Sequence, residues 1–496
     1  MIPSTSIPPF VIRATAIASL GGILFGYDMG VISGALPQLT FAFDLTQNQQ
    51  QLVVGILYLG GGIGAAAGGT LCDTLGRKTA ILVTDIVFGI GALILYWASS
   101  LEELVVGRIV MGFAIAVSGI ADVAYLDEMA PKEWRGAIVS VNEACISLGF
   151  LLAYVAGYMF RLNSSGWRYM FGLSGIVALG QLLGMCGMPE SPLWLKEKGR
   201  LQESHEALRM IYGDEGSIPA EDPHADTRII LVDTSSQPTD KGDSRRYRFV
   251  IMTLRRYHKQ VWIAFFLSVA QQMSGQTNVL NYAPLIFSQF NDEASVRSTL
   301  WIGLVKFVMT VLVIWRIEYM GRRFLLLTGM GFIVVGLLML TLAFVMGNVD
   351  SDDGELVPSR GGMLWALPGV LFVVTGYSAS FGPLTWLLTA ELFPTNIRGR
   401  ALGVSTIVTY LCAFLVTSTF LTAQTWFGGY VFLFYAAFTF MGIVFAYLAI
   451  PETGDKTVSE IEDELLCMWW WRQENYNVLE SVRLQSEQAI LETELT

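Results

Sequence analysis

Long apolar segments alternate with short polar ones along almost the whole chain. A helix needs about 20 apolar residues to cross a bilayer, and it satisfies its backbone hydrogen bonds internally. Twelve segments meet this requirement, at residues 11–36, 51–71, 79–100, 103–126, 136–160, 168–188, 261–290, 299–318, 324–346, 363–389, 401–422 and 428–450. The pattern predicts an all-α polytopic membrane protein with twelve transmembrane helices.

The seventh segment is apolar overall but holds a dense polar cluster. Seven uncharged polar side chains fall within residues 271–281. Two residues that loosen helices accompany them, Gly275 inside the cluster and Pro284 after it. Buried amides are costly unless they find partners, so they should face a neighbouring helix or a wet cavity. Hydrogen bonding between helices explains a single amide. The density of this cluster instead predicts a binding segment for a polyol.

Composition and charge narrow the class of partners. The chain is 53% hydrophobic and only 15% charged, which is typical of a membrane protein. Much of the net charge of −11 lies in the acidic tail 451–496, which argues against nucleic acid as a partner. No Walker-type motif occurs, and the five cysteines have no metal-ligand spacing. We expect no cofactor, no metal site and no enzyme activity.

Basic residues in the short loops predict the orientation. One set of alternate loops carries most of the lysines and arginines, among them Arg77, Arg135, Arg322 and Arg398. By the positive-inside rule these loops are cytoplasmic, and both chain termini lie on the same side.

Three landmarks occur twice in the same order. CDTLGRK (72–78) matches IEYMGRR (317–323), and YLDEMAPKEWRGA (125–137) matches LTAELFPTNIRGRA (388–401). The third pair is MPESP (188–192) and IPETG (450–454). The repeat predicts two six-helix bundles around a central site. The expected domains are a cytoplasmic N-terminus (1–10), an N-terminal bundle (11–188), a cytoplasmic linker with amphipathic helices (189–260), a C-terminal bundle (261–450) and an acidic cytoplasmic tail (451–496).

These landmarks, together with the Gln-Gln of the seventh span and GPLTW (382–386), resemble the sugar porters of the major facilitator superfamily. The resemblance runs from about residue 21 to residue 453. Finer features, such as GQTN (275–278), are similar to the animal class III facilitative glucose transporters. The short loop 347–362 departs from that class, and FGYDMGVISGA (25–35) resembles the proton-coupled sugar and inositol porters.

The resemblance implies a monomeric carrier that works by alternating access, and it implies roles for individual residues. In proton-coupled members the residues matching Asp28 and Arg108 form the coupling pair. A static ion pair that sets helix register is the alternative. The substrate-binding set implied by the family motifs and the polar cluster is Phe25, Glu143, Gln271, Gln272, Thr277, Asn278, Asn281, Lys306, Gly382 and Trp386.

Two members of this set are charged where most sugar porters have amides. Glu143 stands at a glutamine position and Lys306 at an asparagine position. A pairing between them is one hypothesis, and a lysine that extends its ammonium group toward the membrane surface is the other.

Charged residues at the predicted cytoplasmic ends of the helices resemble the family's gate network, which closes the inner side of the carrier. The gate set is Arg77, Glu128, Arg135, Glu190, Glu318, Arg322, Glu391, Arg398 and Glu452. Single exposed pairs contribute only about 0–1 kcal/mol, so such a gate acts through their number.

The sequence predicts a transporter of hexose or a related polyol in a lipid bilayer, with proton symport through Asp28. The alternatives are an uncoupled sugar uniporter and, in another class, a non-transporting sugar sensor. The expected location is the plasma membrane, with a vacuolar or endosomal membrane as the alternative. The sequence does not choose among individual sugars.

Overall fold

The structure is a computed structural model, which describes residues 7–131, 134–212, 257–288, 292–317, 320–347, 360–393, 395–454, 456, 460–461 and 464–465. Every regular element within these ranges is a helix. The central part of the predicted linker, most of the tail and the gate candidate Glu318 lie outside the described residues.

The N-terminal helices follow the first six predicted spans. They are α1 (Pro9–Ala18), α2 (Leu20–Phe43), α3 (Gln47–Leu75), α4 (Arg77–Trp97), α5 (Leu101–Met129), α6 (Arg135–Phe160) and α7 (Gly166–Cys186). The first span is divided at Ser19 into α1 and α2. Local signals set several ends: Thr46 and Gln49 form a capping box on α3, and Gly76 separates α3 from α4 with a φ of +97°.

Two short helices, α8 (Pro192–Glu197) and α9 (Leu201–Tyr212), follow α7. The helical pattern at residues 193–212 predicts them. Trp194 of α8 donates a hydrogen bond to the carbonyl of Asp73 at the end of α3, at 3.0 Å. This part of the predicted linker is therefore held against the N-terminal helices.

The C-terminal helices cover the other six predicted spans. They are α12 (His258–Met273), α13 (Gln276–Asn281), α14 (Ala283–Ser288), α15 (Asp292–Arg316), α16 (Arg322–Gly347), α17 (Arg360–Ala379), α18 (Phe381–Leu392), α19 (Thr395–Phe427) and α20 (Tyr430–Ala449). Eleven helical stretches of the described chain are long and apolar enough to cross a membrane. The remaining predicted span, 261–290, is broken into α12, α13 and α14.

Small residues bring neighbouring helices close together. A Cβ added at Gly26 of α2 would overlap the backbone carbonyl of Ile146 on α6, and one at Gly149 of α6 would overlap that of Ile23. Gly329 and Gly376 make the same kind of approach between α16 and α17. Within a bilayer such backbone packing replaces the hydrophobic effect as the source of helix association.

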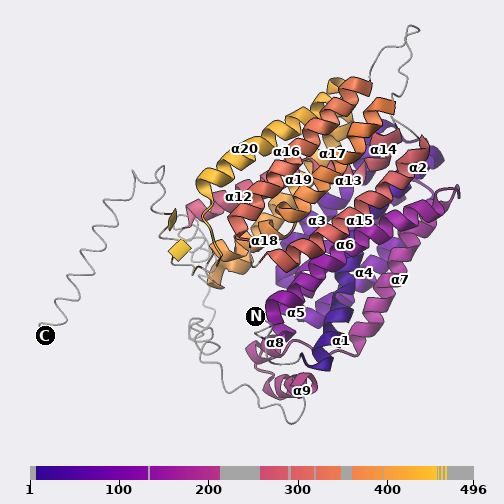
Figure 1. Ribbon diagram of the computed structural model, residues 1–496. Coiled ribbons are helices and arrows are strands. Elements are labelled where there is room, and N and C mark those ends of the chain that lie inside the picture. Colours follow the sequence, from indigo (N-terminus) through magenta and orange to yellow (C-terminus); the bar gives the residue numbers. More distant parts are fainter. Residues whose placement is uncertain are drawn as a thin grey trace, which may run out of the picture.

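The two groups of helices lie side by side, with α15 along α6 and α19 along α3 (Figure 1). We call the end that carries Gly76 and the repeated Gly-Arg sequences the motif end. At the opposite end, Gln51 of α3 donates to Thr422 of α19 at 2.8 Å, and Gln47 donates to Thr425 at 3.0 Å. Nearer the middle, Ser147 of α6 donates to Thr310 of α15 at 2.8 Å. Within the described ranges, no hydrogen bond or ion pair that joins the two groups lies at the motif end.

Candidate functional site

The broken seventh span places its amides where three short helices meet. Gly275 has a φ of +72°, a left-handed conformation that costs glycine little and ends α12 before α13 begins. The hydroxyl of Ser274 donates to the carbonyl of Gln271 at 2.7 Å. The break interrupts the helix in the interior, directly after Gln271 and Gln272.

Gln271 and Gln272 lie together on the last turn of α12. The amide nitrogen of Gln271 lies 2.9 Å from the hydroxyl of Tyr377 on α17 and 3.4 Å from the carbonyl oxygen of Phe381. The amide oxygen of Gln271 is buried and has no partner among the described residues. The amide oxygen of Gln272 accepts from the hydroxyl of Thr277 at 2.8 Å. These groups can donate to and accept from the hydroxyls of a ligand.

The two asparagines of the segment point elsewhere. The amide nitrogen of Asn278 donates to the carbonyl of Val416 at 3.2 Å and to the hydroxyl of Tyr435 at 3.0 Å, inside the packing of α13 against α19 and α20. Asn281 donates to the hydroxyl of Tyr58 on α3 at 2.9 Å. Asn278 therefore bonds residues of α19 and α20 and not Gln271 or Gln272, while Asn281 links the two groups of helices.

Helix α18 supplies an aromatic side chain after a second break. Ser380 separates α17 from α18 with φ −114° and ψ −93°, and Gly382 and Pro383 follow. Trp386 and Gly382 are partly exposed, unlike their neighbours Leu384 and Thr385, which are buried. An indole offers a flat apolar face for the C–H face of a sugar ring.

Glu143 and Lys306 do not form the ion pair that the sequence allowed. Among the described ion pairs neither residue takes part. The ammonium of Lys306 instead lies 4.7 Å from the ring centre of Phe150 and 5.3 Å from that of Tyr377, and Lys306 is only 6% exposed. The lysine therefore does not reach the membrane surface. Cation–π contacts hold the ammonium group, and the charge of Glu143 acts on it electrostatically.

Tyr377 is the residue that the sequence analysis missed. Its hydroxyl bonds Gln271 and its ring lies under Lys306, so it joins two candidate groups from α12 and α15. The signal available in the sequence was a tyrosine five residues before the Gly-Pro of span 10. Such a residue is more often packing than ligand contact, and only its neighbours distinguish the two.

Asp28 and Arg108 meet in the interior of the N-terminal helices. The guanidinium of Arg108 lies 3.3 Å and 3.4 Å from the two carboxylate oxygens of Asp28, and it also donates to the carbonyl of Val53 at 3.4 Å. Both side chains are at most 1% exposed. One arginine therefore connects α2, α3 and α5, and the pair predicted from the sequence is present.

The motif end shows the sequence repeat as a structural repeat. Glu190 accepts from the backbone N–H groups of Lys78 and Thr79 at the start of α4. Glu452 does the same for Arg322 and Arg323 at the start of α16. A carboxylate at a helix N-terminus satisfies orphan donors and interacts favourably with the helix dipole.

A second carboxylate completes each copy of this arrangement. Arg77 lies 3.0 Å from Glu128, which also accepts from Ser191. In the matching place Arg322 lies 3.7 Å from Glu391, which accepts from Thr453. These contacts lie within one group of helices, so in this conformation they brace each group and do not lock the two together.

The other two gate arginines, Arg135 and Arg398, contact groups other than the glutamates of their own motifs. Arg135 pairs with Asp127 at 3.4 Å and not with Glu128, because Glu128 is already held by Arg77 and Ser191. The side chain of Arg398 donates to the carbonyl of Phe393 at 3.4 Å.

Comparison with known proteins adds independent evidence. A family model described as "Sugar (and other) transporter" matches residues 14–465. A putative metabolite transport protein of Bacillus subtilis, YwtG, is 33% identical over 90% of this chain and 93% of its own length. The arabinose-proton symporter of Escherichia coli is 30% identical over 92% of this chain and 93% of its own length. Among solved structures, the inward open conformation of the xylose transporter XylE from E. coli superposes with a TM-score of 0.73 at 28% identity, covering 92% of this chain and 99% of that one.

Proposed function

The chain belongs to the sugar transporter family of the major facilitator superfamily, and on this premise we propose that it carries a hexose or related polyol together with a proton. Sugar transport by alternating access follows from the family. The proton is the further step, and the buried Asp28–Arg108 pair is the observation that supports it.

We place the sugar between Gln271, Gln272 and Thr277 of the broken seventh span, Tyr377 of α17 and Gly382 and Trp386 of α18. Phe25, Glu143 and Lys306 complete the set from the other helices. Amides and hydroxyls would bind the sugar hydroxyls, and the indole would cover an apolar ring face. The buried amide oxygen of Gln271 has no partner among the described residues, so a hydroxyl of the ligand can donate to it.

The two groups of helices, residues 11–188 and 261–450, would rock about this site as two bundles. Their hydrogen bonds to each other lie at the end opposite the motifs and in the middle. Since the positive-inside rule puts the motif end in the cytoplasm, we take this conformation as the one that opens inward. Both termini and the linker would then be cytoplasmic, and the monomer would be the working unit, in the plasma membrane.

The deciding experiment is uptake of labelled hexose into proteoliposomes that contain the purified chain, with and without an inward proton gradient. We expect uptake that the gradient accelerates and drives above equilibrium. Uptake that only reaches equilibrium and does not respond to the gradient would identify an uncoupled uniporter. In that case the Asp28–Arg108 pair would be a static ion pair. Sugar binding without uptake would instead indicate a sensor.

Truncating either glutamine should weaken sugar binding. Gln271→Ala and Gln272→Ala each leave a sugar hydroxyl without its partner, at a cost of about 1–3 kcal/mol. Apparent affinity should fall roughly 5- to 150-fold, as measured by the half-saturation concentration for uptake.

Asn278→Ala provides the matched control for the glutamine variants. It removes an amide from the same segment, but the amide bonds Val416 and Tyr435. It should lower thermal stability and leave sugar affinity unchanged. Normal affinity in both glutamine variants, at normal expression, would remove α12 from the site.

Loss of a gate arginine should affect the conformational equilibrium and spare the site. Arg398→Ala should destabilise the inward-closed state by up to about 1 kcal/mol, a roughly five-fold change in population. Net uptake should fall accordingly while a bound sugar analogue keeps its affinity. Arg200→Ala, which removes the exposed pair with Glu203 on α9 and a contact with the ring of Trp194, is the control and should change neither. Equal losses of binding and uptake in Arg398→Ala would contradict a gating role.

A further inference from the structure

A second buried acidic group lies in the N-terminal helices, apart from Asp28. Asp122 of α5 is fully buried and accepts hydrogen bonds from Ser118 at 2.7 Å and from the amide nitrogen of Gln181 on α7 at 3.0 Å. The amide oxygen of Gln181 is also buried and has no partner within the described ranges. Among the described residues, one hydroxyl and one amide are the donors to this carboxylate. They compensate its negative charge poorly in a membrane interior.

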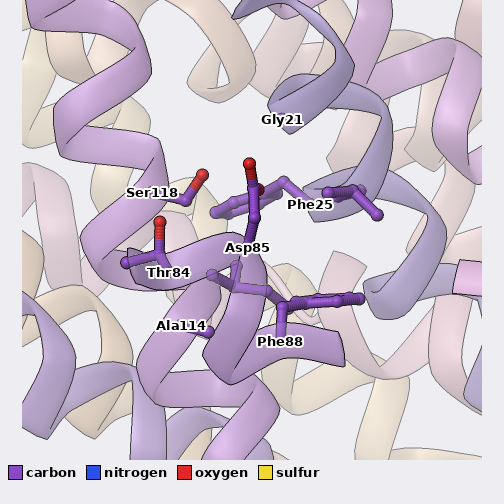
Figure 2. A pocket seen from close by; sticks show the side chains of 9 residues that line it. Gly21, Phe25, Thr84, Asp85, Phe88, Ala114 and Ser118 are labelled. Carbon is purple, nitrogen blue, oxygen red and sulfur yellow. The ribbon is translucent and has the colours of Figure 1, made fainter. Parts of the chain in front are cut away.

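Asp85 of α4 faces the same region. It is 3% exposed, and its Oδ2 atom is buried without a hydrogen-bond partner in the described structure. Figure 2 shows its carboxyl group pointing into a small pocket between α2, α4 and α5, between Ser118 and Phe25. The pocket has room for about one water molecule. Ser118 therefore lies between the surroundings of the two acids, because it lines the pocket that Asp85 faces and donates to Asp122.

No cation balances these two acids among the residues that the structure describes. Arg108, on the same helix as Asp122, is held by Asp28 and Val53. The one arginine of α7, Arg168, donates to the carbonyl of Tyr96. Arg77, at the start of α4, pairs with Glu128 and Asp73 at the motif end. Asp122 acts on Asp85 electrostatically, and its effect is repulsive if both are ionised.

A bound metal ion does not suit this pocket. A hard cation takes about six oxygen ligands, but Thr84, Asp85 and Ser118 are the only lining residues with side-chain oxygens. The hydroxyl of Thr84 donates to carbonyls of its own helix, and that of Ser118 donates to Asp122. The remaining lining residues are glycine, alanine or larger apolar residues. Protonation neutralises a buried carboxylate without any further ligand.

We propose that Asp85 and Asp122 form a proton-binding site, in which at least one of the two carboxyl groups stays protonated at neutral pH. The site is distinct from the Asp28–Arg108 pair, and it does not depend on the proton coupling proposed above. A protonated Asp85 gains a donor that can bond to water in the pocket, while Ser118 joins the pocket to Asp122.

The position of this site connects it to the sugar-binding helices. Phe25, which we assign to the sugar site, lines the same pocket as Asp85 (Figure 2). A Cβ at Gly21 would overlap the carboxylate of Asp122, so α2 packs directly on this acid, seven residues before Asp28. Loss of the proton would leave both acids ionised and draw water into the pocket. The added water would displace the part of α2 that carries Phe25. Occupancy of the site is thus expected to influence sugar affinity.

Infrared spectroscopy of the full-length chain in nanodiscs tests the proposal directly. At about pH 7 an ordinary aspartate, with a pKa near 3.9, is ionised. We expect the wild type to keep a carboxylic acid C=O band that shifts on exchange into D2O. Asp85→Asn or Asp122→Asn should remove or shift that band, while Asp28→Asn should leave it in place.

Two results in the infrared spectrum would overturn the proposal. One is the absence of any carboxylic acid band in the wild type at this pH, a result that needs no variant to fold. The other is a band that neither Asp85→Asn nor Asp122→Asn changes. Thermal stability provides the test for a metal ion: stabilisation by Na⁺ over choline in the wild type, lost in Asp85→Asn, would identify a cation site instead.

Discussion

Replacing Asp28 by asparagine is expected to abolish accumulation of sugar against its gradient while exchange of bound sugar continues. Asparagine has the shape of the protonated acid and cannot release a proton. In the wild type the carboxylate holds Arg108, and through it α3 and α5. Protonation would free the arginine and let the loaded carrier change conformation. In the variant Arg108 is never held by a charged carboxylate, so no group at this position can bind or release a proton in response to the gradient.

The measurement is sugar-induced proton uptake in proteoliposomes, together with counterflow of labelled sugar. Wild type should show both, and Asp28→Asn should show counterflow alone. Glu143→Gln is the matched comparison, because Glu143 is a second acid near the site and lacks an ion-pair partner among the described residues. If Glu143→Gln lost coupling while Asp28→Asn kept it, the coupled proton would be carried by Glu143 and not by Asp28.

Removing Arg108 is expected to destabilise the N-terminal helices severely. Arg108→Met keeps the volume of the side chain but leaves Asp28 charged and unpaired at 0% exposure. Breaking a buried pair on one side typically costs about 3–5 kcal/mol. We expect a large drop in melting temperature and in the yield of monodisperse protein.

The double variant Arg108→Met with Asp28→Asn separates charge from packing. Neutralising the acid removes the unpaired charge, so the double variant should recover much of the lost stability without recovering coupling. Thermal unfolding of the three proteins in the same detergent gives the comparison. A double variant that is no more stable than Arg108→Met would show that the arginine acts through its bond to Val53 and its packing, and not through the charge of Asp28.

Much of the fold could be predicted from the sequence, since the cost of exposing backbone to hydrocarbon leaves few solutions. The lengths of the apolar segments predicted the helices, and the matched motifs around Arg77 and Arg322 predicted a repeated architecture. The Asp28–Arg108 contact was also predictable, because a buried acid in one span requires a counter-charge in another. Breaks within spans were less predictable: Gly275 signalled one, whereas the division at Ser19 carried no clear signal.

The direction of each polar side chain was decided by the tertiary structure. Gln271 and Asn278 are both amides of one segment, yet the turn at Gly275 rotates α13 so that Asn278 bonds Tyr435 while Gln271 bonds Tyr377. Lys306 lies on two aromatic rings although an acid is near. Asp85 and Asp122 belong to separate spans, and the packing of α4 on α5 brings them to one region. Sequence determines which segments must be helical and which charges need compensation, because these follow from local hydrophobicity. Which side chain supplies the compensation depends on helix rotation and crossing, and those are set by contacts between residues far apart in the chain.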